Sequence, residues 1–322
     1  MNDKMKILLQ PSRLLAAFMA RYCTWLPEDT FLKCRYRLLM KQKLHLDNPQ
    51  TFTEKIQWLK LHDRKPMYAK MVDKYEVKEY VARRIGNQRV IPTFGVWNRF
   101  DDIDFSQLPM QFVLKSTNGG GGSGVIICKD KRGLDKTAAK HLLNRSMKTT
   151  ADIRQGEWVY KGVKPRIIAE KLMVPVKNPT SSFLSDYKFY CFNGEPAYCQ
   201  VIRDRNTKET IDFYDMDWKH QEFVGLNPHV KNGKEPVECP LNFELMKWVC
   251  RKLAQNIPFV RVDLYVIDDE VFFGELTFYP NSGYGEFNPK EWDLKIGEML
   301  KLPNGGVKCS ILYSREEVRI CA

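Results

Sequence analysis

The stretch Phe259-Val-Arg-Val-Asp-Leu-Tyr265, followed by Phe272-Phe-Gly-Glu-Leu-Thr-Phe278, decides how this chain is interpreted. Each half is rich in Val, Leu and aromatic residues, and this composition predicts a short buried β-strand. Between the halves, Asp268-Asp269-Glu270 supplies residues that favour a turn. The sequence therefore predicts a β-hairpin.

Charged side chains interrupt both strands of this hairpin. Because side chains alternate along a strand, Arg261 and Asp263 share one face of the first strand. Glu275 and Thr277 share one face of the second strand for the same reason. If the pairing register allows, one guanidinium and two carboxylates converge. Such a set suits a magnesium–phosphate site, because Mg²⁺ takes one or two carboxylates together with phosphate oxygens. A buried salt bridge with only a structural role is the alternative.

Size and charge set broad limits on the function. The 322 residues can bury a large core and form two or three lobes. With 43% hydrophobic and 28% charged residues, the composition excludes a disordered chain or a coiled coil. The net charge of +12 favours acidic partners such as phosphates, anionic lipid, acidic glycan or nucleic acid.

The cysteines and the apolar runs favour a cytoplasmic location. Nine scattered cysteines without a CxxC pair indicate reduced thiols in the cytoplasm, and five dispersed histidines argue against a zinc site. No apolar run approaches the roughly 20 residues that span a bilayer. Pro11 and Arg13 interrupt the first apolar segment, which argues against a cleaved signal peptide.

Residues 1–45 form a basic amphipathic extension. A helix is expected over residues 12–26, and a second helix is expected after Pro27. Peripheral contact of residues 1–43 with the anionic inner face of the cell membrane is one interpretation of this basic, aromatic segment. The other interpretation is that both helices pack their apolar faces against the main body.

Residues 46–108 predict a helical lobe. Thr51 and Glu54 form a capping-box pattern at the start of one helix. A single helix is expected over residues 71–85, and a strand over residues 91–97. An acidic connection over residues 100–108 follows.

A glycine-rich loop separates two strands in the next segment. Strands are expected over residues 111–115 and 125–128, with Gly119-Gly-Gly-Gly-Ser-Gly124 between them. The loop opens no helix, so it is not a dinucleotide-binding turn, and no Walker lysine follows it. Lys115 precedes the glycines and no HRD segment follows, which excludes a protein kinase. What remains is a flap whose backbone amides close over phosphates, or a merely flexible loop.

The second half of the chain alternates strands and helices. Helices are expected over residues 134–147, 243–255 and 291–300, and strands over residues 165–173 and 186–192. Asn193-Gly194 predicts a hairpin turn into another strand, which ends near Arg203 and Arg205. Residues 207–240 are expected to be mostly loop.

The order of these motifs resembles the ATP-grasp superfamily, and in particular its TupA-like branch, which is found with genes for bacterial surface polysaccharides. The resemblance covers residues 48–302. It is carried by Asn48-Pro-Gln-Thr-Phe52, Glu54-Lys-Ile-Gln-Trp-Leu59, Val72-Asp-Lys-Tyr75, Phe112-Val-Leu-Lys115, Lys164-Pro-Arg-Ile-Ile-Ala-Glu170, Asp186-Tyr-Lys188, Phe259-Val-Arg-Val-Asp263 and Gly274-Glu-Leu-Thr-Phe-Tyr-Pro280.

The resemblance implies an α/β (α+β) ATP-grasp fold, in which two α+β subdomains clasp ATP behind an N-terminal helical extension. The boundaries that follow are residues 1–45 for the extension, 46–108 for the helical lobe, 109–170 for the glycine-flap subdomain, 171–310 for the C-terminal subdomain with the magnesium site, and 311–322 for a tail.

The resemblance also implies a role for individual residues. Glu170 would bind adenine and Asp186 the ribose. Asp263 and Glu275 would bind Mg²⁺, and Arg261 would contact the γ-phosphate or the developing oxyanion. The residues that would contact phosphates are Lys74, Lys115, Lys188 and the flap residues Gly120, Gly121, Gly122 and Ser123. Many family members have Asn where this chain has Thr277, so Thr277 or Asn281 is left to complete the metal site. Arg203 and Arg205 are candidate anchors for an acidic substrate, or the ends of a solvated strand.

The implied activity is an ATP-dependent ligase that joins a carboxylate, such as a uronic acid of a surface-glycan precursor, to an amine through an acyl phosphate. Its partners would be a small-molecule or lipid-linked glycan and an amine co-substrate, without nucleic acid. A kinase on the same scaffold, a sugar transferase using Asp215-Met-Asp217, and a non-catalytic membrane binder are the alternatives.

Overall fold

The computed structural model describes residues 11–119, 124–148, 155–175, 186–203, 209–227 and 230–303. The α-helices are α2 (Pro11–Tyr22), α3 (Glu28–Met40), α4 (Phe52–His62), α5 (Met67–Val72), α6 (Val77–Ile85), α7 (Lys136–Met147), α9 (Phe243–Ala254) and α10 (Glu291–Met299). The strands are β1 (Thr93–Trp97), β2 (Phe112–Ser116), β3 (Val125–Cys128), β4 (Ile167–Lys171), β5 (Asp186–Phe192), β6 (Glu195–Arg203), β7 (Thr210–Asp215), β8 (His220–Gln221), β9 (Val224–Gly225), β10 (Phe259–Ile267), β11 (Glu270–Thr277) and β12 (Phe287–Asn288).

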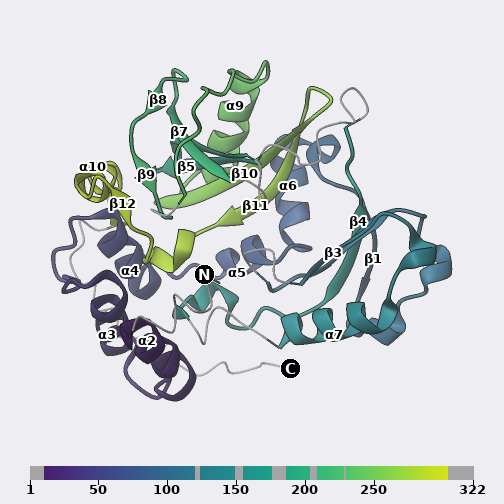
Figure 1. Ribbon diagram of the computed structural model, residues 1–322, viewed down its shortest axis with the longest axis horizontal. Helices are drawn as coiled ribbons and strands as arrows, with labels where there is room; N and C mark the ends of the chain where they lie inside the picture. Colours follow the sequence, from purple (N-terminus) through teal and green to yellow (C-terminus); the bar gives the residue numbers. More distant parts are fainter. Residues whose placement is uncertain are drawn as a thin grey trace, which may run out of the picture.

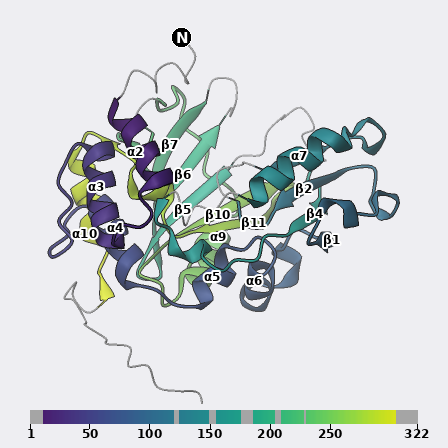
Figure 2. The same cartoon turned by 90° about the horizontal axis from the view of Figure 1, so that it is seen from below.

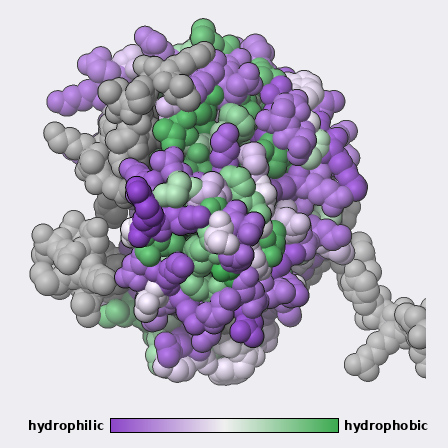
Figure 3. Space-filling model, turned by 90° about the vertical axis from the view of Figure 1, so that its right-hand side faces the viewer, coloured by the Kyte–Doolittle hydropathy of each residue, from purple (hydrophilic) through white to green (hydrophobic). Residues whose placement is uncertain are grey.

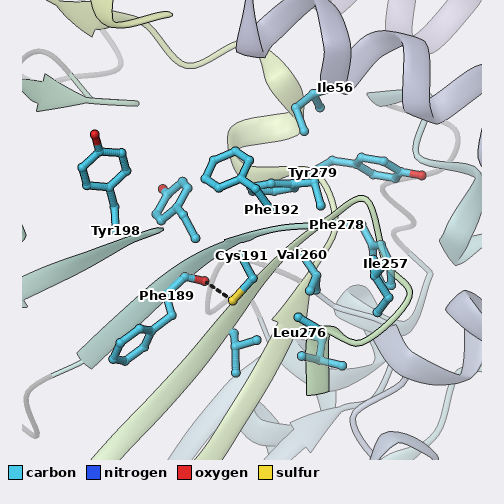
Figure 4. Packing of buried hydrophobic residues seen from close by; sticks show 14 of the residues in the cluster. Ile56, Phe189, Cys191, Phe192, Tyr198, Ile257, Val260, Leu276, Phe278 and Tyr279 are labelled. Carbon is cyan, nitrogen blue, oxygen red and sulfur yellow. Dashed lines mark hydrogen bonds between the residues drawn. The ribbon is translucent and has the colours of Figure 1, made fainter. Parts of the chain in front are cut away.

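The larger sheet has six strands in the order β11-β10-β5-β6-β7-β8, and the paired strands run antiparallel. Two-residue turns connect β10 to β11 and β5 to β6: Asp268 and Asp269 are both left-handed, with φ of 50° and 68°, as are Asn193 and Gly194. Helix α9 packs against β5, β6 and β10 (Figure 1). Buried residues of β5, β10 and β11 lie together in the main core, among them Cys191, Val260 and Leu276 (Figure 4).

The smaller sheet has four strands in the order β1-β4-β2-β3 and lies beside the larger one (Figure 1). It has a separate core in which Phe112, Leu114 and Ile167 of the sheet meet Ala139 and Leu143 of α7. A single parallel bridge between Val90 and Phe273 joins this lobe to β11. On the side of the molecule that Figure 3 shows, hydrophilic side chains predominate, with hydrophobic ones between them.

Helix α4 packs on the larger sheet, and α3 lies beside α4 (Figure 2). The Phe52 ring of α4 lies 5.0 Å from the Phe259 ring of β10. The expected capping box is present: the Thr51 side chain accepts a hydrogen bond from the Glu54 amide, and the Glu54 carboxylate accepts one from the Thr51 amide. No helix among the described residues is long and apolar enough to cross a membrane.

One expectation about secondary structure was wrong. The helix expected over residues 71–85 is broken, because Asp73 is extended and its Oδ1 accepts from the amides of Tyr75 and Glu76 at 2.8 and 2.9 Å. This interaction begins a new helix, α6. The segment over residues 207–240 is mostly loop where the structure describes it, as expected, but it also contains three short strands: β7 and β8 extend the larger sheet, and β9 forms a two-stranded sheet with β12.

Candidate functional site

A β-bulge in the β10–β11 hairpin decides which face Glu275 occupies. From the turn to the pair Leu264 and Phe273 the strands pair residue for residue, and then Asp263 pairs with Glu275. Gly274 is the extra residue. If the strands paired without this bulge, Gly274 would pair with Asp263 and Glu275 with Val262. Glu275 would then point to the opposite face, because a one-residue shift in register reverses every side chain beyond it. The bulge therefore places both carboxylates on one face.

Glycine suits this bulge because another backbone lies close to it. A Cβ on residue 274 would lie 2.9 Å from the carbonyl oxygen of Asp263 and 2.9 Å from the ring of Tyr265. Real Cβ atoms rarely come so near a backbone oxygen, so any side chain would push the strands apart or move the bulge.

Arg261 holds the carboxylates and the hydroxyl of the hairpin together. Its Nε and Nη2 donate to Asp263 Oδ1 at 2.6 Å and Oδ2 at 2.8 Å. The same Nη2 lies 3.4 Å from Glu275 Oε1 and 3.1 Å from Thr277 Oγ1. This convergence is the one that the sequence predicted on condition that the pairing register allowed it. The two-point contact with Asp263 fixes the plane of the guanidinium.

Lys188 joins this cluster from β5, where it pairs with Asp263. Its Nζ contacts Asp263 Oδ2 and lies 2.8 Å from Asp186 Oδ2. Burial raises the pKa of Asp263, but the charges of Arg261 and Lys188 outweigh burial and hold it below the ordinary value of 3.8. The buried carboxylate therefore stays ionised because two cations accompany it.

A second charged cluster lies on the smaller sheet. Glu170 of β4 contacts Lys115 of β2 at 2.6 Å and Lys78 of α6 at 2.5 Å. Lys78 also donates to the Ile91 carbonyl and to Thr93 Oγ1, both at 2.7 Å. Burial raises the pKa of Glu170, but the two lysines lower it by more than burial raises it, so the pKa stays below its ordinary value of 4.5. Nothing in the sequence singles out Lys78, which looks like any lysine of an amphipathic helix.

Lys74 lies between the two clusters, at the break between α5 and α6. Its amide donates to the Thr117 carbonyl at 3.2 Å, and its Nζ donates to the Gly119 carbonyl at the edge of the glycine loop. Burial lowers the pKa of Lys74, and the Glu275 carboxylate of the other sheet partly offsets this effect. Lys74 and Glu275 are therefore close enough to interact, so the charges of the two sheets come together in one region, which we call the shared space.

The structure does not bring Arg203 to this space. A second bulge in the β5–β6 hairpin lies at Ala197, because Cys191 pairs with Pro196 but Tyr190 pairs with Tyr198. Arg203 consequently shares the opposite face with Val201, and its guanidinium contacts Asp212 at 3.0 Å and the Glu235 carbonyl at 2.9 Å. The expectation that Arg203 anchors a substrate in this site is not supported by its position.

The two candidates for completing the metal site, Thr277 and Asn281, lie in different surroundings. The Asn281 amide donates to the Leu226 carbonyl at 2.7 Å, whereas the Thr277 hydroxyl lies within the hairpin cluster. Of the two candidates for completing the metal site, Thr277 is therefore the better placed. Gly120, Gly121, Gly122, Ser123 and Arg205 lie outside the described residues.

A buried lysine next to the site was missed by sequence reasoning. Lys60 of α4 is fully buried and donates to the carbonyls of Gln155 at 3.0 Å and Ser282 at 2.8 Å. Burial lowers its pKa to about 7, although the nearby Glu157 carboxylate opposes this shift. Glu157 accepts from the Ser282 hydroxyl. The only sequence signal was a single charge inside the apolar run Trp58-Leu-Lys-Leu61.

The family model for TupA-like ATP-grasp proteins matches residues 54–301, which is most of the chain. The chain belongs to the TupA-like ATP-grasp family. No curated protein matches the sequence. The resemblance inferred from the motifs is thereby confirmed, as is the α/β ATP-grasp fold.

Solved structures are similar to this chain at low identity. D-alanine–D-alanine ligase from Helicobacter pylori is 14% identical, with a TM-score of 0.43 over 79% of this chain and 68% of that one. The D-alanine–D-alanine ligase from Bacillus anthracis is 15% identical, with a TM-score of 0.40 over 76% and 67%. The ATP-grasp ligase PsnB in complex with its minimal precursor, Mg and ADP is 13% identical, with a TM-score of 0.37 over 81% and 65%.

The residues of this TupA-like protein fit a magnesium-bound nucleotide. Asp263 is 1% exposed, whereas the Glu275 side chain is 37% exposed, so one carboxylate is buried and the other opens to the shared space. Among the described residues no group of three or more His, Cys, Asp or Glu side chains gathers into a metal site. Two carboxylates and a hydroxyl suit Mg²⁺, which fills its remaining positions with phosphate oxygens and water.

Proposed function

We propose that this protein is an ATP-dependent ligase that joins a carboxylate to an amine through an acyl phosphate. Family membership supports ATP-dependent ligation in general. The observation that carries the proposal is the register pairing of Asp263 with Glu275 on the face that also holds Arg261 and Lys188, opposite Lys74.

The cations of the site have a distribution that suits a polyphosphate. On the smaller sheet, Lys115 and Lys78 face the single carboxylate Glu170, and Lys74 adds a third positive charge. This surplus favours the phosphates of ATP. On the larger sheet, Arg261 lies beside both carboxylates, where it can bind the γ-phosphate or stabilise an oxyanion. Bound Mg²⁺ would neutralise charge on the phosphates as they transfer.

The chemistry needs no nucleophile from the protein. A substrate carboxylate attacks the γ-phosphorus, ADP leaves, and an acyl phosphate forms; an amine then attacks the acyl carbon and phosphate leaves. The role of the chain is to bind, orient and neutralise, and to exclude water that would hydrolyse the acyl phosphate. Asp186 and Glu170 are the residues proposed for ribose and adenine, and Gly120 to Ser123 for the phosphates.

We further propose that the carboxylate is a uronic acid of a surface-polysaccharide precursor, small or lipid-linked, and that the reaction takes place in the cytoplasm without nucleic acid. The basis for this substrate class is the TupA-like branch together with the net charge of +12, which favours acidic partners.

The decisive experiment supplies ATP, Mg²⁺ and a panel of uronic acids, with and without amines, and detects products by mass spectrometry. An amide that forms only with both substrates is expected, and hydroxylamine should trap the acyl phosphate as a hydroxamate. Asp263→Asn should abolish both products. Asp269→Asn is the matched control in the same hairpin, because Asp269 is exposed and asparagine tolerates its left-handed backbone. A stable phosphate ester formed without any amine would instead identify a kinase.

A further inference from the structure

Helix α2 turns its large apolar side chains outward. The exposed fractions are 42% for Leu14, 50% for Leu15, 54% for Phe18, 57% for Tyr22 and, just after the helix, 77% for Trp25. We call these five residues the α2 stripe. A helix that only covers a core does the reverse, with large apolar residues inside and polar residues outside. A cluster of this kind on a protein surface marks an interaction site.

The opposite face of α2 is occupied by smaller residues. Ala16, Met19 and Ala20 are buried there and pack towards α3. The α2 stripe itself is continuous, because Phe18 and Tyr22 are four residues apart and their rings lie 4.8 Å from each other. Packing on α3 therefore uses one face of the helix and leaves the more apolar face outside.

Positive charge lies close to the α2 stripe. Residues 11–43 contain seven basic and two acidic residues. Arg13 and Arg21 are exposed on α2 itself, and the Arg21 guanidinium lies 5.6 Å from the centre of the Tyr22 ring. Lys41, at the end of α3, donates to the Ser12 hydroxyl at the start of α2. The other exposed basic residues of this segment are Lys33, Arg37 and Lys43.

We propose that the α2 stripe and its basic border bind an anionic lipid bilayer, with the apolar side chains inserted between headgroups and the cations on the lipid phosphates. Aromatic and aliphatic side chains with a mainly basic border match a surface that is apolar within and anionic outside. Helix α2 lies beside α3 at the periphery of the molecule (Figures 1 and 2). The membrane can therefore reach it without covering the two sheets. This inference does not depend on the ligase reaction.

The test is cosedimentation of the full chain with vesicles of phosphatidylcholine alone or mixed equally with phosphatidylglycerol. Binding is expected only to the mixed vesicles, and it should weaken at high salt. Phe18→Ser with Trp25→Ser should reduce binding more than tenfold, because the inserted apolar area is lost. The matched control is Leu241→Ser with Trp248→Ser, which removes apolar side chains that are 92% and 40% exposed elsewhere.

A charge-reversal pair tests the basic border separately. Arg13→Glu with Arg21→Glu should weaken binding more than about 25-fold, since each lost basic residue near an anionic surface accounts for about fivefold and the two new carboxylates are repelled. Arg83→Glu with Arg132→Glu makes the same change of net charge at side chains that are 74% and 81% exposed on other elements. ATP binding and thermal unfolding should be unchanged in the α2 variants.

Two results would overturn the proposal. The first is that the wild type does not bind anionic vesicles, or that the control pairs lose binding as much as the α2 variants. The second is a dimer, detected by light scattering, that the α2 variants abolish while vesicle binding stays the same. That second result would assign the α2 stripe to contact between copies of the chain.

Discussion

Replacing Gly274 with alanine should damage the site more than it damages the fold. The new Cβ would lie 2.9 Å from the Asp263 carbonyl oxygen and from the Tyr265 ring. Favourable carbon contacts are about 3.5–4.0 Å, so both neighbours would be about 0.6 Å too close. A backbone oxygen cannot rotate away as a flexible side chain can. Overpacking of this kind costs about 1–3 kcal/mol of folding free energy.

The effect on activity follows from the position of the bulge. Relief of the contact moves the bulge or separates β10 from β11, and Glu275 is the next residue along the chain. A displacement of about 1 Å at a reacting centre can reduce the rate about a hundredfold. We therefore expect Gly274→Ala to lower kcat/KM for ATP about a hundredfold, while the free energy of unfolding falls by about 1–3 kcal/mol.

The assay pairs denaturant unfolding with steady-state release of ADP. Gly133→Ala is the control, because a Cβ there meets nothing within 4 Å and its backbone is not left-handed. That control should match the wild type in both measurements. If Gly274→Ala also kept wild-type stability and activity, the close approach of the two strands would not hold Glu275 in place, and the reasoning from the bulge would be wrong.

Three further changes test separate parts of the site. Lys115→Met should raise the Kd for ATP about 10- to 100-fold, because one charge-assisted hydrogen bond is lost. Lys171→Met, at an exposed lysine on the paired strand β4, should change the Kd little, and calorimetry measures both values. Arg203→Met should leave ATP turnover unchanged but lower stability by about 1–3 kcal/mol, because Asp212 is 1% exposed and loses a partner; a large loss of turnover would return Arg203 to the site. The folded pKa of Glu170 lies below its ordinary value of 4.5, so its ion pairs stabilise the fold above that pH and are lost as the pH falls through the folded pKa. Acid unfolding monitored by circular dichroism should therefore be less steep in Glu170→Gln, and an identical pH profile would contradict the assigned pairs.

Local patterns in the sequence were sufficient for the elements and for many of the site residues. Alternation along β10 placed Arg261 with Asp263, and the left-handed turns at Asp268 and Asn193 followed from the residue types that tolerate that conformation. The capping box at Thr51 formed because its partners are only three residues apart. Interactions of this range depend on neighbours in the chain and are present in the sequence itself.

The faces on which distant residues meet were decided by tertiary structure. One bulge at Gly274 brings Glu275 to the face of Asp263, and another at Ala197 takes Arg203 away from it. Strand alternation gives the relation of residues within one strand, but a one-residue bulge reverses the relation between strands. A bulge forms where packing across the sheet favours it, and a single sequence does not reveal that.

The same limit explains the charged partners that only the structure identified. Lys78 reaches Glu170 because α6 begins at the break after Asp73 and lies against the smaller sheet. Lys60 is tolerated in a buried helix because the carbonyls of Gln155 and Ser282, from distant parts of the chain, accept its hydrogen bonds. The sequence thus determined which residue types are available and how each local segment folds. The packing of segments far apart in the chain determined which charges meet, because desolvation and Coulomb energy depend on distance in space.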